Sequence, residues 1–153
     1  LSSINEIKIA CEAIKNFKKP ILIGVHLNNK GYLPSGETIE DLIPISNNYN
    51  CCGIITACVS PEIVNIVIPK LMNQNLPFGF KVNAFKNIPE NNAIDSDLKN
   101  NGYPTERYGS RADKFNPEVF KRFVESKLKD GVTLLGGCCE IKPRHIKALK
   151  KII

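Results

Sequence analysis

The chain has 153 residues, of which 42% are hydrophobic and 24% are charged, and its 21 Lys and Arg against 15 Asp and Glu give a net charge of +6. It can therefore bury an ordinary core without disulfide bonds, and its basic residues are too scattered, with no aromatic residues between them, for a nucleic-acid surface. No apolar run is long enough to cross a bilayer and no signal peptide opens the chain, so we expect a cytoplasmic protein without membrane partners.

The first half of the sequence alternates helical and strand patterns. Segment 2–17 begins with capping serines and repeats apolar residues every three to four positions, which predicts an amphipathic helix. The short apolar run at 21–27 predicts a buried strand, and 38–46 predicts a short helix after a turn-rich loop. A second strand is expected at 53–59, followed by a helix from Ser60 to about Asn75.

The second half continues the alternation after one interruption. Segment 76–84 predicts a third strand, and the polar stretch 85–115 is longer than an ordinary connection. A helix is expected at 116–130, a fourth strand at 132–137 and a closing helix at 142–153.

These elements predict one α/β domain over residues 1–153, built from parallel strand-helix units. Each predicted strand is apolar at successive positions, which favours a sheet covered on both faces. Four such units form either a small open sheet or half of an eight-stranded barrel. The periodicity alone leaves both architectures open.

The most unusual residues stand where the predicted strands end. They are His26, Cys58, Asn83, Cys138 and Cys139. The carboxyl ends of parallel strands meet at one edge of a sheet or barrel, and sites are built there. We therefore expect these side chains to lie near one another.

The six cysteines differ in what their positions predict. In a reducing compartment, thiols or metal ligands are expected rather than disulfides. Cys58, Cys138 and Cys139 suit a Zn²⁺ site, because catalytic zinc keeps three protein ligands and one open position; the alternative is that they are small buried residues. That alternative is preferred for Cys11, because it lies on an apolar helix face. It is also preferred for Cys51 and its neighbour Cys52, because a strand about 20 Å long separates them from the carboxyl edge.

The motif GGCC at 136–139, followed by Pro143, and the segment ACVSPEIV at 57–64 resemble the zinc-dependent homocysteine S-methyltransferases. That family includes the betaine and S-methylmethionine enzymes and the homocysteine module of methionine synthase. The resemblance covers nearly the whole chain but only the second half of the family's barrel. It implies strands 5–8 of a TIM (β/α)₈ barrel, and a chain that is a fragment of the whole. It also implies Cys58, Cys138 and Cys139 as zinc ligands.

Some positions depart from the family. Ala57 stands where Asn is usual, Val82-Asn83-Ala84 falls where Tyr-Pro-Asn is frequent, and Glu140 follows GGCC where Gly is common. The family's barrel also supplies, from its first and fourth strands, an Asp-Gly and a Glu that hold the amino group of homocysteine. Neither lies in these residues.

The resemblance implies methyl transfer from an unidentified small-molecule donor to the thiol of L-homocysteine, giving methionine. His26 and Asn83 are candidates for substrate binding, whereas His145 is expected to be structural. The loop 35–38 either faces the site or simply leads into a helix. The stretch 85–115, which contains Arg107 and Arg111, is either a cover for the donor or an ordinary crossing loop.

Two other functions stay open at this stage. One is a non-catalytic half-barrel that binds zinc or presents thiols and needs a partner chain, a second copy or a first half. The other is a redox role for Cys138 and Cys139, which is disfavoured because the chain has no C-x-x-C motif.

Overall fold

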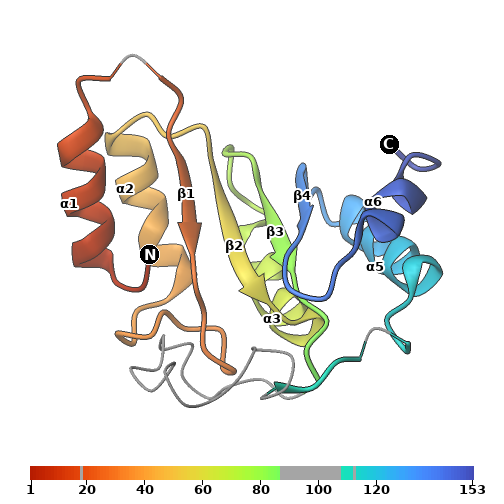
Figure 1. Ribbon diagram of the computed structural model, residues 1–153. Coiled ribbons are helices and arrows are strands. Elements are labelled where there is room, and N and C mark those ends of the chain that lie inside the picture. Colours follow the sequence, from red (N-terminus) through yellow and green to blue (C-terminus); the bar gives the residue numbers. More distant parts are fainter. Residues whose placement is uncertain (18, 87–107, 112) are drawn as a thin grey trace.

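Four parallel strands form one sheet in the computed structural model, which describes residues 1–17, 19–86, 108–111 and 113–153 (Figure 1). The strands lie side by side in chain order and are β1 (Leu22–Val25), β2 (Gly53–Val59), β3 (Phe78–Val82) and β4 (Leu134–Gly137). Every neighbouring pair is parallel. The predicted parallel α/β fold is therefore confirmed.

The helices begin where the sequence places capping residues. They are α1 (Ile4–Ile14), the 3₁₀ helix η1 (Ile39–Asp41), α2 (Leu42–Asn48), α3 (Pro61–Leu71), α5 (Pro117–Lys129) and α6 (Pro143–Leu149). The side chains of Ser3, Ser60 and Asn116 accept hydrogen bonds from the first turns of α1, α3 and α5. Such caps satisfy backbone N–H groups that a helix itself leaves unpaired.

Several predicted elements are longer than the observed ones. Helix α3 ends at Leu71 rather than near Asn75, since asparagines in that segment favour turns. The expected helix at 38–46 is divided into η1 and α2, and α6 stops at Leu149, after which the Ile152 N–H bonds to the Leu149 carbonyl in a turn. Apolar runs extend past the residues that pair, so they overestimate strand length.

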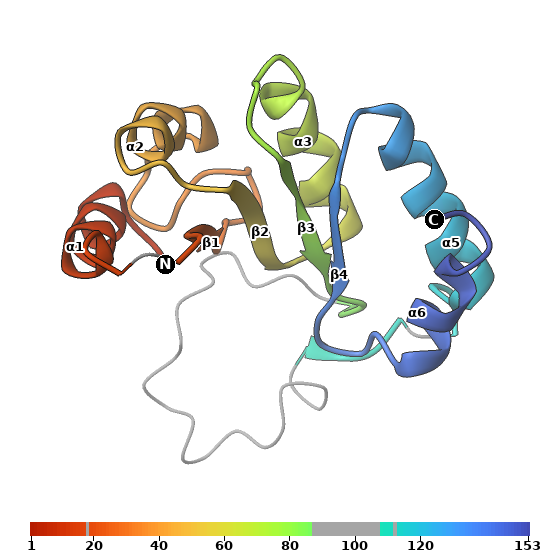
Figure 2. The ribbon, with the colours of Figure 1, turned by 90° about the horizontal axis from the view of Figure 1, so that it is seen from above.

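The helices lie on the outer side of a curved sheet (Figure 2). Phe78, Phe80 and Val82 of β3 point to that side and are buried, as are Ile23 and Val25 of β1. The core between sheet and helices is completed by apolar residues of the helices, among them Ile7, Ile63, Val67, Phe120 and Val124. Burial of this layer supplies the main stabilisation of the fold.

The expectation that both faces are covered is wrong for the described residues. No described helix packs on the opposite side of the sheet (Figure 2), where Leu22 is 47% exposed. We call this side the inner face; the strand register and side-chain alternation place on it Leu22, Gly24, Gly53, Ile55, Ala57, Gly79, Lys81, Leu134 and Gly136. Because glycine, leucine and isoleucine are apolar whether covered or not, the sequence did not distinguish the two faces.

Gly79 is the inner-face position with the least room. A Cβ at this residue would lie 1.7 Å from the carbonyl oxygen of Leu134, its partner on β4. The close approach involves two backbones, so no rotation of a side chain relieves it. At Gly24, by contrast, a Cβ would meet nothing nearer than the Ile55 Cγ2 atom, at 3.7 Å.

Gly79→Ala is accordingly expected to lower the free energy of unfolding by about 3 kcal/mol or more, because β3 and β4 must separate to admit the methyl group. Gly24→Ala, the matched control on the same face, is expected to change it by less than about 1 kcal/mol. Urea unfolding followed by circular dichroism measures both. Equal effects of the two substitutions would contradict the close approach at Gly79.

Candidate metal centre

Three cysteine sulfurs converge at the carboxyl edge of the sheet. Cys58 belongs to β2, and Cys138 and Cys139 directly follow β4. The Sγ atom of Cys139 lies 3.6 Å from that of Cys58 and 4.0 Å from that of Cys138, and all three lie within 4.8 Å of one another. Strand β3 lies between β2 and β4, so the thiols meet across the carboxyl end of β3.

A bulge in β2 gives Cys58 its position. Ala57 pairs with Lys81 and Val59 with Val82, which leaves Cys58 as an extra residue between two regular pairs. Its φ of 55° is in the left-handed region that non-glycine residues rarely adopt. Bulges redirect a side chain out of the normal alternation of a strand, and strained residues of this kind gather at functional sites.

The side chain of Asn83, just beyond β3, holds this bulge. Its Nδ2 donates to the Cys58 carbonyl at 2.6 Å and lies 3.8 Å from the Cys58 sulfur, while its Oδ1 accepts from the Phe85 N–H at 3.2 Å. Asn83 is 6% exposed, so its polar atoms find these partners inside the protein. The structure brings Asn83 to the centre, and its role toward a substrate stays a prediction.

The glycine before the cysteine pair is required by the turn that follows. The Ile141 N–H bonds to the Cys138 carbonyl at 3.0 Å, and Glu140 has a φ of 66°. This turn brings the Ile141 side chain back over Gly137, where a Cβ would lie 2.2 Å from the Ile141 Cγ2 atom. Backbone bonds from Cys138 N–H to the Val82 carbonyl and from Ala84 N–H to the Cys139 carbonyl then fix both cysteines against β3.

The donor set and its spacing fit a zinc ion. All six cysteines are free thiols, and tetrahedral zinc with Zn–S bonds of about 2.3 Å requires sulfurs about 3.8 Å apart. The separations of the Cys139 sulfur from those of Cys58 and Cys138, 3.6 and 4.0 Å, bracket that value. Three cysteines leave the fourth position of a tetrahedron for a water or a substrate atom.

Hydrogen bonding among the thiols makes them unequal in acidity. The thiol of Cys138 donates to Cys58, which lowers the pKa of Cys58 and raises that of Cys138, and burial raises the pKa of both Cys138 and Cys139. Cys58 is therefore the first of the three to lose its proton. A cation must displace the remaining protons, so its affinity falls as the pH is lowered.

The other cysteines lie away from this centre, as predicted. Cys11 is buried on α1, and Cys51 and Cys52 precede β2 at its amino end. The expectation of a small buried residue is confirmed for Cys11 and Cys51 but is wrong for Cys52, which is exposed. Burial, together with the neighbouring Cys11 thiol, raises the pKa of Cys51 to about 11. Cys51 is thus a protonated core residue at neutral pH.

The two histidines have different surroundings. His145 is fully buried: its Nδ1 accepts from the Lys142 N–H at 2.9 Å, its Nε2 lies 3.1 Å from the Phe115 carbonyl, and its ring meets Phe120 edge-on. This confirms the structural role expected for it. His26 follows β1 at the carboxyl edge and is half-buried.

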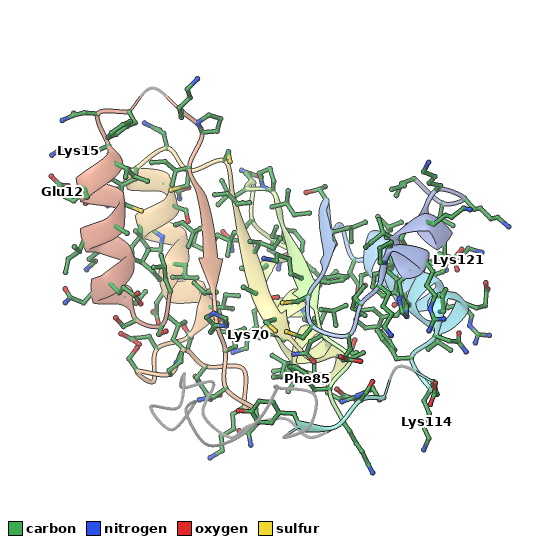
Figure 3. All side chains as sticks on the ribbon, in the orientation of Figure 1. Glu12, Lys15, Lys70, Phe85, Lys114 and Lys121 are labelled. Carbon is green, nitrogen blue, oxygen red and sulfur yellow. The ribbon has the colours of Figure 1, made fainter. Side chains whose placement is uncertain are left out.

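An arginine contact at this edge was missed by the sequence reasoning. Arg111 donates from Nη1 to Glu62 Oε1 and from Nε to the Phe85 carbonyl, both at 2.5 Å. Residues Phe85 and Ser110 form an antiparallel bridge, and Figure 3 shows Phe85 at the carboxyl end of the sheet. Among the described residues, Arg111 is therefore engaged with the protein itself. Arg107 lies outside the described residues.

The loop 35–38 contacts the first helix. The hydroxyl of Ser35 bonds to the Ser2 carbonyl at 2.9 Å and to the Glu37 carboxylate, whose Oε1 accepts from the Ile4 N–H at 3.3 Å. The Ser35 hydroxyl lowers the pKa of Glu37. These bonds support the interpretation of this loop as a turn that also fixes the start of α1.

Within the described part of the chain, no helix combines the length and apolarity that a membrane crossing needs.

Comparison with known proteins matches the sequence to one family and the fold to a solved structure. The sequence model of the homocysteine S-methyltransferase family matches residues 1–153. The crystal structure of the homocysteine methyltransferase MmuM from Escherichia coli, in an oxidized form, has a TM-score of 0.69 to this chain at 17% sequence identity. The match covers 99% of this chain and 42% of that one. No curated protein sequence matches.

A parallel α/β sheet whose carboxyl edge gathers three thiols defines a protein with a candidate catalytic metal centre. Because the family match extends over all 153 residues, the chain belongs to the homocysteine S-methyltransferase family. The resemblance of the GGCC and ACVSPEIV segments to this family is thereby confirmed.

The surroundings of His26 predict its titration. Burial lowers its pKa from 6.5, the N-terminal ammonium and Lys81 add to the effect, and a hydrogen bond to the backbone of Ala57 opposes it. We expect an NMR titration of its ring to have a midpoint below 6.5. The unfolded state then binds the proton more readily than the folded state. The free energy of unfolding should therefore decrease as the pH falls below 6.5, and His26 should have no effect on it above that pH.

His26→Gln should remove that part of the pH dependence of unfolding as the pH falls below about 6.5, while leaving stability at pH 8 nearly unchanged. A midpoint at or above 6.5, or a pH profile that His26→Gln does not alter, would contradict the burial of the ring.

Proposed function

We propose that this protein takes part in zinc-dependent methyl transfer to the thiol of L-homocysteine, giving methionine. The observation that supports it is the convergence of Cys58, Cys138 and Cys139 within 4.8 Å at the carboxyl edge of the sheet. Family membership supplies the substrate class. The methyl donor would be a small molecule that carries the methyl group on a positively charged or otherwise activated atom.

The proposed roles of the residues follow from their geometry. Cys58, Cys138 and Cys139 would hold the ion, and Asn83 would keep Cys58 in its bulge through the 2.6 Å bond to its carbonyl. A zinc ion bound there would lower the pKa of a substrate thiol from about 8.5 and so present it as a thiolate at neutral pH.

Methyl transfer itself requires alignment more than further catalytic groups. The substrate sulfur attacks the methyl carbon, the new C–S bond forms as the bond to the donor atom breaks, and the electron pair leaves with the donor. Holding both reactants in line supplies much of the acceleration. His26 and Asn83 are placed at the same edge of the sheet and are our candidates for orienting the substrate.

The proposed architecture is strands 5–8 of a TIM barrel, with residues 1–153 as one structural unit of it. The exposed inner face supports this, because the inside of a barrel is filled by side chains from all of its strands. Four further strands would cover that face and supply the Asp-Gly and Glu that hold the amino group. They would come from a first half-barrel, either upstream in the same chain or on a partner chain in the cytoplasm; a second copy of this chain could cover the face but would lack the Asp-Gly and the Glu.

Elemental analysis of the purified chain tests the metal centre. We expect about one zinc per chain at pH 7.5, lost in Cys58→Ser, Cys138→Ser and Cys139→Ser, because removing one thiolate of three greatly weakens binding. Cys51→Ser is the matched control and should retain the metal, since Cys51 lies outside the cluster. Zinc absent from the wild type, or lost only from the control, would contradict the proposal.

A methyl-transfer assay then separates catalysis from binding. The zinc-loaded chain is mixed with homocysteine and a methyl donor, with and without a separately expressed first half of a family barrel, and methionine is measured. Formation of methionine that requires the three cysteines supports the proposed function. Zinc binding without methionine in either mixture would favour the non-catalytic half-barrel instead.

The exposed inner face predicts association. Leu22, Ile55 and Leu134 together leave apolar surface uncovered, and β1 and β4 are the edge strands of the described sheet. Sedimentation velocity of the chain alone is expected to show dimers or larger species, and the complementing half should convert them into a heterodimer. A stable, monodisperse monomer would contradict the half-barrel proposal.

A further inference from the structure

Lys81 is the only charged residue in the four described strands. It lies in β3, between Phe80 and Val82, which point to the buried outer side, so its own side chain is on the inner face. A charged side chain on the inside of a sheet is costly when it is covered and has no partner. Lys81 is exposed in this structure, but once the inner face is covered, as the proposed barrel requires, its charge needs a partner there.

The first part of the Lys81 side chain leans toward β4. Its Cγ lies 3.0 Å from the place where a Cβ on Gly136 would stand, so the missing side chain of Gly136 leaves the space for the lysine stem. Lys81 is exposed and forms no ion pair with any described residue. Its ammonium group is thus available to an anion.

The position of Lys81 relates it directly to the metal centre. Its register partners are Ala57 on β2 and Gly136 on β4, and Cys58 and Cys138 follow those two residues by one and two positions. The Lys81 Cα is therefore about 6.6 Å, two strand residues, below the level of Asn83 and Cys138. A lysine side chain spans a distance of that order.

His26, on the same edge, does not compete for this role. His26 follows Leu22 and Gly24 in the side-chain alternation of β1, which puts it on the inner side, where burial and the nearby positive charges of the N-terminus and Lys81 lower its pKa and so disfavour its charged form. Lys81 is then the positive charge of the inner face beneath the thiols.

We propose that Lys81 determines the substrate class of the site by binding the carboxylate of an amino-acid thiol whose sulfur is held at the cysteine centre. This inference rests on the proposed function. A carboxylate and a thiol joined by a short carbon chain match a lysine whose Cα stands about two strand residues below the level of Cys138. The charge-assisted hydrogen bond selects such a thiol over one that lacks the carboxylate.

Calorimetric titration of the zinc-loaded chain with two thiols tests this proposal. L-homocysteine and 3-aminopropane-1-thiol carry the same thiol and amine, and only the first has a carboxylate. We expect the wild type to bind homocysteine about five- to tenfold more tightly. Lys81→Met should abolish this preference and leave the Kd of 3-aminopropane-1-thiol within twofold, whereas Lys81→Arg should retain most of it.

The controls separate three outcomes. Lys8→Met, which removes an exposed lysine of α1, should keep the wild-type preference, and the zinc content of every variant should match the wild type. The role of Lys81 would be overturned if Lys81→Met left the Kd of homocysteine unchanged, or if it altered the Kd of 3-aminopropane-1-thiol instead. Either result would leave the proposed function standing. A wild type that retains zinc but binds neither thiol would overturn both.

Discussion

Parallel pairing of β2, β3 and β4 is the constraint on which the candidate site depends. Because all three strands run in one direction and pair residue by residue, their carboxyl ends lie at one edge. Residues that are 80 positions apart in sequence, Cys58 and Cys138, are thereby brought within reach of one ion. The single irregularity in this pairing, the bulge at Cys58, is also the point where Asn83 joins the end of β3 to β2.

The same edge is reinforced by contacts that involve no cysteine. Arg111 joins Glu62, at the start of α3, to the backbone of Phe85, and the Ser110 hydroxyl donates to the Glu140 carboxylate at 2.8 Å. Glu140 is the residue that directly follows the cysteine pair. The segment that returns to the sheet after β3 is thus attached on both sides of the candidate metal centre, which limits the movement of the residues around its three cysteines.

The inner face links the architecture to the proposed chemistry. Its glycines at 24, 53, 79 and 136 keep the surface shallow, and larger residues of neighbouring strands lie across some of them. Such alternation of small and large residues is how barrel interiors are filled. Within this face Lys81 alone carries charge, so a pocket formed by covering it would combine apolar walls, one cation and a thiol centre.

The sequence by itself determined the order of elements, the capped helix starts, the parallel α/β class and the family, because these depend on local patterns: apolar periodicity, Ser and Asn caps, and the GGCC motif. It also placed the three thiols at strand ends. Only the tertiary structure decided that one face of the sheet is uncovered, that Cys58 is in a bulge held by Asn83, that Arg111 pairs with Glu62, and that Lys81 lies beneath the cysteines. Each of these depends on contacts between residues distant in the chain, and an apolar or charged residue has the same identity in the sequence whichever face it occupies.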